Sequence, residues 1–87
     1  MKPIIKKPTE KEKADAQSWP IWEKDISTFP WEYDCEETCL FLEGDVIVTN
    51  ETEDTFHCGK GDYAVFPKGM KCTWDIKKPV RKHYNLK

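Results

Sequence analysis

The sequence contains no long apolar run, no low-complexity tract and no internal repeat. Its apolar stretches are far shorter than the roughly 18 residues of a transmembrane helix, so no membrane partner is expected. No N-terminal apolar stretch resembles a signal peptide, and we therefore expect a cytoplasmic location. The basic residues do not form the uniformly positive pattern of a nucleic-acid binder, so no nucleic-acid partner is expected either.

What the sequence does contain is enough for one domain, since 87 residues are too few for two. Aromatic side chains are plentiful, with four Trp, four Phe and three Tyr, and each buries roughly 150–250 Å² when enclosed. A core is therefore feasible without disulfides, although a second copy would add buried surface to so small a domain. We predict an N-terminal arm and helix over residues 1–18 and one domain over residues 19–87, with a homodimer as the alternative to a monomer.

The four cysteines, Cys35, Cys39, Cys58 and Cys72, match no zinc-finger or redox spacing. Without a secretory signal, free thiols in a reducing compartment are the better interpretation. We expect Cys39 and Cys58 in the core and Cys35 in a loop.

Charged residues are segregated along the chain, although the net charge is only −2. Every charged residue between Glu32 and Asp54 is acidic, whereas basic residues dominate from Lys60 onward. This pattern indicates either cross-strand charge pairs or a dipolar surface. The basic cluster within residues 77–82 is more typical of a solvated face than of an anion site.

The N-terminal segment predicts a short strand at Ile4 and Ile5, followed by one helix. Thr9 and Glu12 have the spacing of a capping box, in which a hydroxyl and a carboxylate satisfy the first amides of a helix. The helix is expected to end before Pro20, because the residue preceding a proline avoids helical dihedral angles. Its apolar face is thin, so we expect it on the surface.

From Trp19 onward the pattern changes to that of short β-strands. Gly44-Asp45 is predicted as a turn, and Lys78-Pro79 as a break between two strands. The expected strands cover residues 21–24, 29–33, 38–43, 46–49, 55–58, 63–66, 70–77 and 80–84. Many short strands with a single helix predict an all-β sandwich or barrel.

The spacing between several turn residues narrows the prediction of an all-β sandwich or barrel. Five residues separate Gly61 from Pro67, Gly69 completes a Pro-x-Gly turn, and six residues separate Glu37 from Gly44. Glycines permit positive φ in tight turns, and a proline presets the turn that it begins. The arrangement resembles the two motifs of the cupin superfamily over about residues 19–87. The resemblance implies an all-β fold, a small cupin or jelly-roll antiparallel β-barrel with a short N-terminal helix.

The same resemblance implies a metal site of three histidines and one glutamate, from which this sequence departs. Trp31 and Tyr33, or Pro30 and Glu32 on the longer spacing, stand where the first motif has its His-x-His pair, and Cys72 replaces the third histidine. Only Glu37 of the usual ligand set remains. We therefore predict no cofactor, and the alternative is a divalent metal held by Glu37, Cys72 and a histidine.

Several segments are similar to a small single-domain cupin family, the DUF861-like family, which is related to the cupin domains of (S)-ureidoglycine aminohydrolase. The aminohydrolase resembles a fused pair of cupins that binds manganese through histidines, so a metal-assisted hydrolase is one implied function. Many single-domain members have no established activity. The similar segments are Trp19–Trp22, Glu37–Cys39, Leu42–Gly44, Lys71–Trp74 and Val80–Tyr84.

Aromatic residues at the old ligand positions indicate either a barrel filled by side chains or an aromatic pocket for a planar or apolar ligand. Glu37 is either a ligand or acid–base group, or a rim carboxylate paired with Lys82 or Arg81. Cys72 is either a nucleophile that faces the interior or a small buried hydrophobe. The candidate ligand-binding residues are Trp31, Tyr33, Glu37, Cys72, Trp74, Lys82 and Tyr84.

We therefore expect a cupin that binds a small molecule in its barrel without the three-histidine site, and we assign no catalytic residue. The alternative is a metal-assisted hydrolase akin to (S)-ureidoglycine aminohydrolase. A further alternative is a non-catalytic dimeric scaffold. An open cavity is required for binding, whereas a barrel packed solid with aromatics would exclude it.

Overall fold

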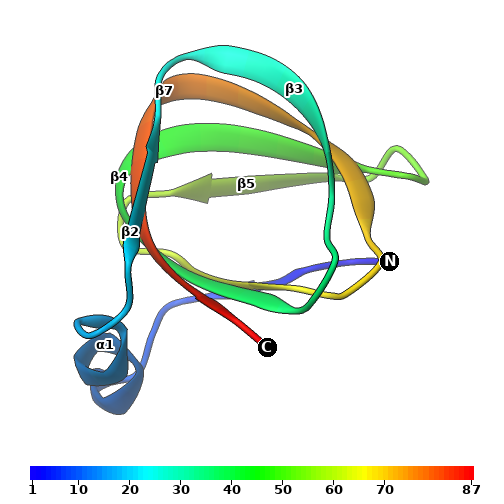
Figure 1. The fold of residues 1–87 in the computed structure, drawn as a ribbon. Helices are drawn as coiled ribbons and strands as arrows, with labels where there is room; N and C mark the ends of the chain where they lie inside the picture. The colour runs from blue at the N-terminus through cyan, green and yellow to red at the C-terminus, as the bar shows by residue number, and fades with distance from the viewer.

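The computed structural model describes all 87 residues and contains one seven-stranded sheet and one helix. The sheet curls around the core as a barrel, and the helix lies outside it at one end (Figure 1). The predicted all-β class and antiparallel barrel are confirmed. The elements are β1 (Ile4–Lys6), α1 (Glu10–Ala16), β2 (Ile21–Lys24), β3 (Ser27–Glu32), β4 (Glu37–Asn50), β5 (Thr55–Gly59), β6 (Tyr63–Phe66) and β7 (Lys71–Leu86).

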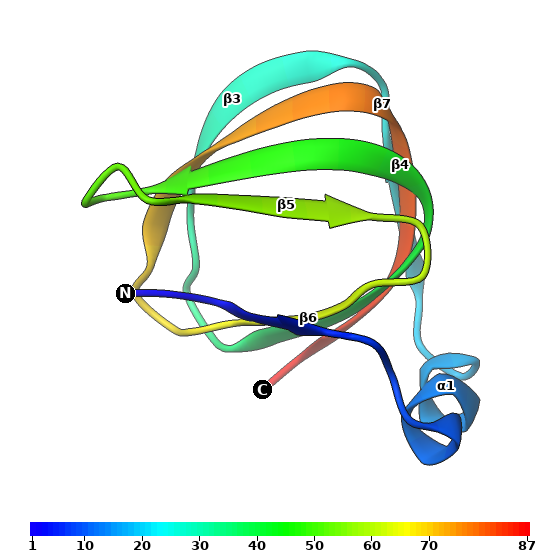
Figure 2. The ribbon, with the colours of Figure 1, turned by 180° about the vertical axis from the view of Figure 1, so that it is seen from behind.

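Every strand pair is antiparallel, and the sheet has the order β1-β6-β4-β7-β2. β5 pairs with β4, and β3 pairs with β7. The view from behind shows β5 and the β1–β6 pair on the side away from β2 (Figure 2). No pairing joins the outer strands to each other, so the sheet is not strictly closed. Because β7 pairs with β2, β3 and β4, side chains from four strands meet on one inner face.

β4 and β7 are longer than the sequence predicts, and both predicted interruptions are wrong. Gly44-Asp45 is not a turn but an irregularity within β4, where the register against β7 shifts. Gly44 has a φ of 121°, and a Cβ at this position would lie 2.8 Å from the Val80 Cα. Pro79 likewise lies within β7, between the paired residues Lys78 and Val80, so the missing N–H falls where the ladder is already irregular.

The N-terminal predictions are confirmed. The Thr9 hydroxyl accepts a hydrogen bond from the Glu12 amide at 3.1 Å, and the Glu12 carboxylate accepts one from the Thr9 amide at 2.8 Å. The helix lies on the surface, and Ala16 is its buried residue. No helix has the length and apolar character needed to span a bilayer.

The main core lies inside the curl of the sheet and is rich in aromatic residues. All four cysteines are free, and Cys39 and Cys58 are fully buried, as predicted. Cys35 is half-buried in the segment before β4. The thirteen residues of the main core are Tyr33, Cys39, Phe41, Val46, Val48, Cys58, Ala64, Phe66, Met70, Cys72, Trp74, Ile76 and Val80.

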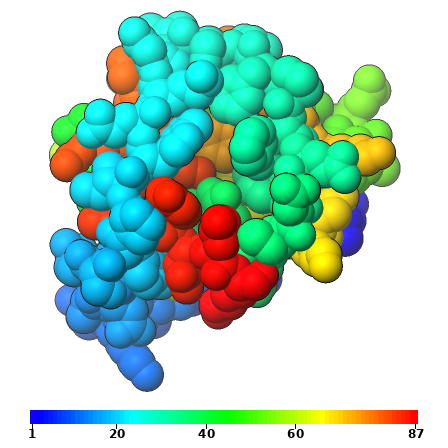
Figure 3. Space-filling view, viewed as in Figure 1, coloured from blue at the N-terminus to red at the C-terminus, as the bar shows by residue number.

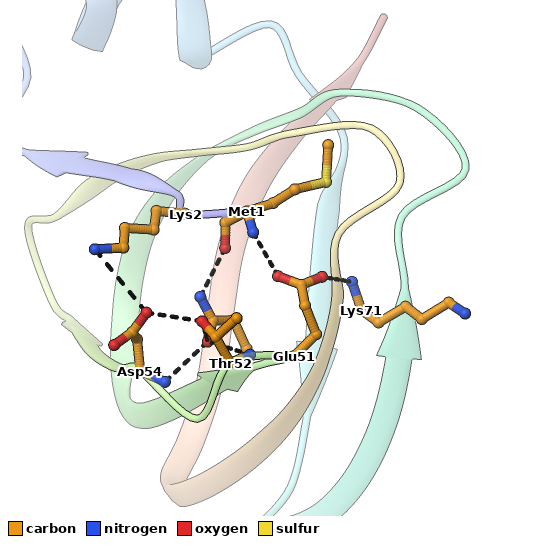
Figure 4. A network of polar contacts seen from close by, with 7 residues as sticks. Met1, Lys2, Glu51, Thr52, Asp54 and Lys71 are labelled. Carbon is orange, nitrogen blue, oxygen red and sulfur yellow. Dashed lines mark hydrogen bonds and ion pairs between the residues drawn. The ribbon is translucent and has the colours of Figure 1, made fainter.

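Polar contacts tie the N-terminal residues to the turn between β4 and β5 (Figure 4). The Met1 ammonium lies 2.6 Å from Glu51, and the Met1 carbonyl accepts a hydrogen bond from the Asn50 side chain at 2.7 Å. The second Glu51 oxygen accepts a hydrogen bond from the backbone amide of Lys71 at 3.1 Å. One turn therefore connects the start of the chain with the beginning of β7.

Candidate functional site

A cavity of about 490 Å³ lies between β2, β3, β7 and the start of β4. This volume is within the range of small-molecule binding sites. In the space-filling view, cyan residues of β2 and β3, the green start of β4 and the red end of β7 surround a hollow (Figure 3). The lining residues are Trp22, Lys24, Phe29, Pro30, Trp31, Tyr33, Glu37, Trp74, Lys82, Tyr84 and Leu86.

Trp74 is the centre of an aromatic wall. Its ring stacks with Phe29 at 6.2 Å and with Phe41 at 6.3 Å, and Trp22 meets it edge-on at 6.0 Å. The Trp74 indole N–H donates a hydrogen bond to the Tyr33 hydroxyl at 3.2 Å. Aromatic pairs at such distances stabilise a fold beyond the area that they bury. Trp74 and Phe41 are buried, so Trp22 and Phe29 are the half-buried parts of this wall that a flat, apolar group in the cavity would meet.

Lys82 places a positive charge against this wall. Its cross-strand partners are Trp22 on β2 and Phe41 on β4, so the three side chains share the inner face. The Lys82 Nζ lies 4.6 Å from the centre of the Trp74 ring, 4.8 Å from Trp22 and 5.8 Å from Phe41. Such cation–π contacts offset part of the cost of removing an ammonium from water. Lys82 is only 4% exposed, so the prediction of a solvated face is wrong for this member of the basic cluster.

Glu37, the first residue of β4, is the counter-ion of Lys82. Its Oε2 accepts hydrogen bonds from Lys82 Nζ at 2.8 Å and from Cys39 Sγ at 3.0 Å. Its Oε1 has no partner within the protein, whereas every fully buried side-chain oxygen has one. Oε1 therefore faces the cavity, where it is free to accept a hydrogen bond from a bound molecule. The predicted pairing with Lys82 is present, but inside the barrel rather than at its rim.

The protonation states follow from burial and from the neighbouring charges. Burial works to lower the pKa of Lys82, but the negative charge of Glu37 beside it outweighs burial and raises this pKa above its ordinary value. Burial also raises the pKa of Cys39, which keeps this thiol protonated and able to donate to Glu37. At neutral pH the cavity floor therefore holds an ammonium beside a carboxylate.

Cys72 is the predicted site residue that does not line the cavity. It is a core residue with 8% exposure, paired in register with Trp31 on β3 and Asn50 on β4. Burial raises the pKa of its thiol to about 11, and a nucleophilic cysteine needs the opposite shift. The buried-hydrophobe alternative therefore describes this residue. The predicted residues that do line the cavity are Trp31, Tyr33, Glu37, Trp74, Lys82 and Tyr84.

The sequence prediction did not include Trp22, Lys24, Phe29, Pro30 and Leu86, which also line the cavity. Phe29 had a readable signal, because it lies two residues before Trp31 and therefore on the same face of its strand. Trp22 and Lys24 had none, since their facing depends on the register between β2 and β7.

The side chains of the cavity do not fit the metal site that the cupin resemblance implies. No three His, Cys, Asp or Glu side chains lie close enough together to hold a metal ion. Neither histidine lines the cavity, and His83 contacts the Trp19 carbonyl at 3.0 Å through its Nδ1. The carboxylate of Glu37 already faces the Lys82 ammonium, which would repel a second cation.

The strand order and the lined cavity define a small barrel of the cupin type. The family model of the EutQ-like cupin domain matches residues 11–84, and the chain therefore belongs to this family. The predicted cupin membership is confirmed. The chain has no significant match among the curated proteins.

Solved structures agree with this assignment. A DUF861 family protein from Thermotoga maritima is 48% identical, with a TM-score of 0.94 over 99% of this chain and 100% of that chain. A putative ethanolamine utilization protein Q from Salmonella typhimurium is 30% identical, with a TM-score of 0.66 over 74% of this chain and 51% of that chain. The EutQ protein of Clostridium difficile is 20% identical, with a TM-score of 0.67 over 74% of this chain and 50% of that chain, and it shows the fold alone.

The chain spans about half the length of the Salmonella typhimurium and Clostridium difficile proteins. The similarity to the small DUF861 protein, in contrast, extends over both chains in full or nearly so. The likeness to (S)-ureidoglycine aminohydrolase is not part of these findings and stays a prediction.

Proposed function

We propose that this protein binds a small organic molecule with a flat, apolar body in the cavity between β2, β3 and β7. The observation that carries the proposal is that the aromatic residues wall a space of about 490 Å³ instead of filling it. Pockets that are mostly apolar, with a few polar groups directed inward, are typical of small-molecule sites. Glu37 and Lys82 are the inward-directed polar groups here.

Exposed apolar surface at the cavity supports the same function. Trp31 is 51% exposed and Leu86 is 53% exposed, and both line the cavity. Covering apolar surface stabilises a complex by roughly 25 cal/mol for each Å² removed from water. A ligand seated against the wall would therefore gain affinity from side chains that otherwise remain in contact with solvent.

The chemistry of the cavity favours binding over catalysis. A covalent mechanism needs an activated nucleophile, and the thiol that contacts Glu37, Cys39, is fully buried with a raised pKa. A metal-assisted hydrolase needs a set of ligands that the cavity side chains do not supply. A protein that served only as a dimeric scaffold would not use the cavity. Substitutions in the cavity lining would then leave its function unchanged.

The tryptophans provide a built-in test. Trp22, Trp31 and Trp74 line the cavity, whereas Trp19 does not and packs on Tyr63. We would titrate 2-naphthoate, 2-naphthamide and 2-naphthylmethylammonium into the protein and follow the four indole N–H resonances by NMR. We expect saturable shifts for the three cavity tryptophans with at least one probe and none for Trp19. The proposal is overturned if no cavity resonance shifts, or if Trp19 shifts as much as the others.

A matched pair of variants locates the binding to the cavity. Trp31→Ala removes an exposed part of the wall and should weaken binding of the same probes about tenfold, with little loss of thermal stability. Ile26→Ala removes a comparably exposed apolar side chain that is not part of the cavity lining. Equal effects of the two substitutions would show that the probes bind to apolar surface in general.

A further inference from the structure

We propose that the ligand of this cavity is an organic monoanion, with a flat apolar body on the aromatic wall and a carboxylate that pairs with Lys24. This inference rests on the proposed function and adds the charge class of the ligand and the residue that selects it. It follows from the charges of the lining, from the position of Lys24, and from the free oxygen of Glu37.

The lining has one uncompensated positive charge. Its charged residues are Lys24, Glu37 and Lys82. Glu37 and Lys82 form a buried ion pair at 2.8 Å and neutralise each other. Lys24 forms no ion pair with any residue of the chain. The lining therefore carries a net charge of about +1 at neutral pH, which a monoanion would balance.

The acidic neighbours of Lys24 are engaged elsewhere. Glu23 pairs with Arg81 at 3.1 Å, on the other face of β2. The Asp25 carboxylate accepts a hydrogen bond from the following backbone amide at 2.8 Å. Glu23 is thus paired on the other face, and Asp25, although charged, forms no ion pair with Lys24, so the Lys24 ammonium is left for a ligand.

Lys24 is held over the aromatic wall. Its Nζ lies 5.1 Å from the centre of the Phe29 ring, and Phe29 stacks with Trp74. A flat ring packed on this wall would place a substituent next to the Lys24 ammonium. Because Lys24 is exposed, a carboxylate could pair with it and keep part of its hydration shell. An anion that pairs with Lys24 therefore avoids part of the free-energy cost of removing its charge from water.

The cavity floor sets the orientation of the ligand. Glu37 Oε1 faces the cavity without a hydrogen-bond partner and would repel a second carboxylate placed beside it. The carboxylate of the ligand therefore lies toward Lys24. A hydroxyl or amino group at the opposite end of the molecule would donate to Oε1. A dianion would place its second carboxylate beside this oxygen and should bind more weakly than a monoanion.

Three probes with the same ring separate charge from shape. We would measure the dissociation constants of 2-naphthoate, 2-naphthamide and 2-naphthylmethylammonium by calorimetry at low salt. The anion should bind roughly fivefold more tightly than the neutral amide, and the cation should bind most weakly. The Lys24→Met variant keeps an apolar stem without the charge, and it should bind the anion and the amide about equally. Lys60→Met, a change outside the cavity lining, is the matched control and should leave all three affinities unchanged.

Salt gives an independent readout of the same contact. Raising NaCl from about 0.05 M to about 0.5 M should weaken binding of 2-naphthoate and leave 2-naphthamide unaffected. If the amide binds as tightly as the anion and Lys24→Met changes nothing, the monoanion is overturned while the proposed function stands. If none of the three probes binds in the cavity, the proposed function fails together with this inference.

Discussion

Lys82 lies in a buried environment in which an unpaired ammonium would be strongly destabilising. It is almost fully buried, and its ammonium is held by Glu37 and by the faces of Trp22 and Trp74. Removing two opposite charges from water is costly, and their attraction repays that cost only when further contacts satisfy both groups. Here Cys39 and the aromatic rings provide those contacts.

Lys82→Met should destabilise the protein strongly, because it leaves Glu37 as an unpaired buried carboxylate. We expect the free energy of unfolding in urea to fall by about 3–5 kcal/mol. The double variant Glu37→Gln/Lys82→Met should recover most of this loss, since neither group is then charged. A double variant that loses the sum of the two single effects would contradict a coupled pair.

At the scale of single residues, the cupin resemblance, with aromatic residues at its ligand positions, predicted several residues that line the cavity but not its extent. Trp74, Lys82 and Tyr84 all lie at even-numbered positions of β7, on one face of the strand, and all line the cavity. Cys72 has the same parity and yet lies in the core, because alternation gives the face of a strand and not the position of a cavity along it. Lys24 was beyond prediction, since its inward position depends on pairing with the distant Val80 region of β7.

Among the elements, β3 and β7 supply most of the cavity lining, and the lengths of β4 and β7 could not be predicted. Gly44 and Pro79 are typical of turns and breaks, so each long strand was predicted as two short ones. The same residue types also occur at irregularities within strands, where the chain bends without reversing. The outcome here depends on the shifted register between β4 and β7, which no local pattern contains.

Gly44→Ala should reveal how closely β4 and β7 approach at this irregularity. The alanine would have to adopt a φ of 121°, and its Cβ would lie 2.8 Å from the Val80 Cα. Both the backbone strain and the clash oppose the substitution. We expect a loss of about 3 kcal/mol in the free energy of unfolding.

Gly61→Ala is the control for the backbone conformation alone. Gly61 has a φ of 87°, but the nearest atom to an added Cβ is 4.0 Å away, at the end of the Lys7 side chain. This variant should lose only about 1–2 kcal/mol. Equal losses at the two positions would show that the close approach of Val80 is not costly.

For the whole molecule, we expect the buried cysteine thiols to lower the free energy of unfolding at high pH. Burial raises the pKa of Cys72 to about 11 and that of Cys58 to about 12. An unfolded thiol loses its proton at a pH of about 8.5, so above that pH unfolding releases protons and becomes more favourable. The raised pKa of Lys82 acts in the same direction, because its contribution is lost as the pH rises through its folded-state pKa.

Urea denaturation between pH 7 and pH 11 measures this effect. The free energy of unfolding should be nearly constant up to a pH of about 8 and should decline steadily above about pH 9. Replacing both Cys58 and Cys72 by alanine should lower stability at neutral pH and make the decline shallower. A free energy that stays level up to pH 10 in the unmodified protein would contradict the assignment.

The positive charge beside Glu37 belongs to a side chain of the protein, the ammonium of Lys82. It is in place as soon as the barrel folds, because it belongs to a side chain and no ion has to be delivered to it. Every folded copy therefore carries the same charge at the same position, whatever metals the surroundings supply. A single substitution at position 82 is enough to remove this charge.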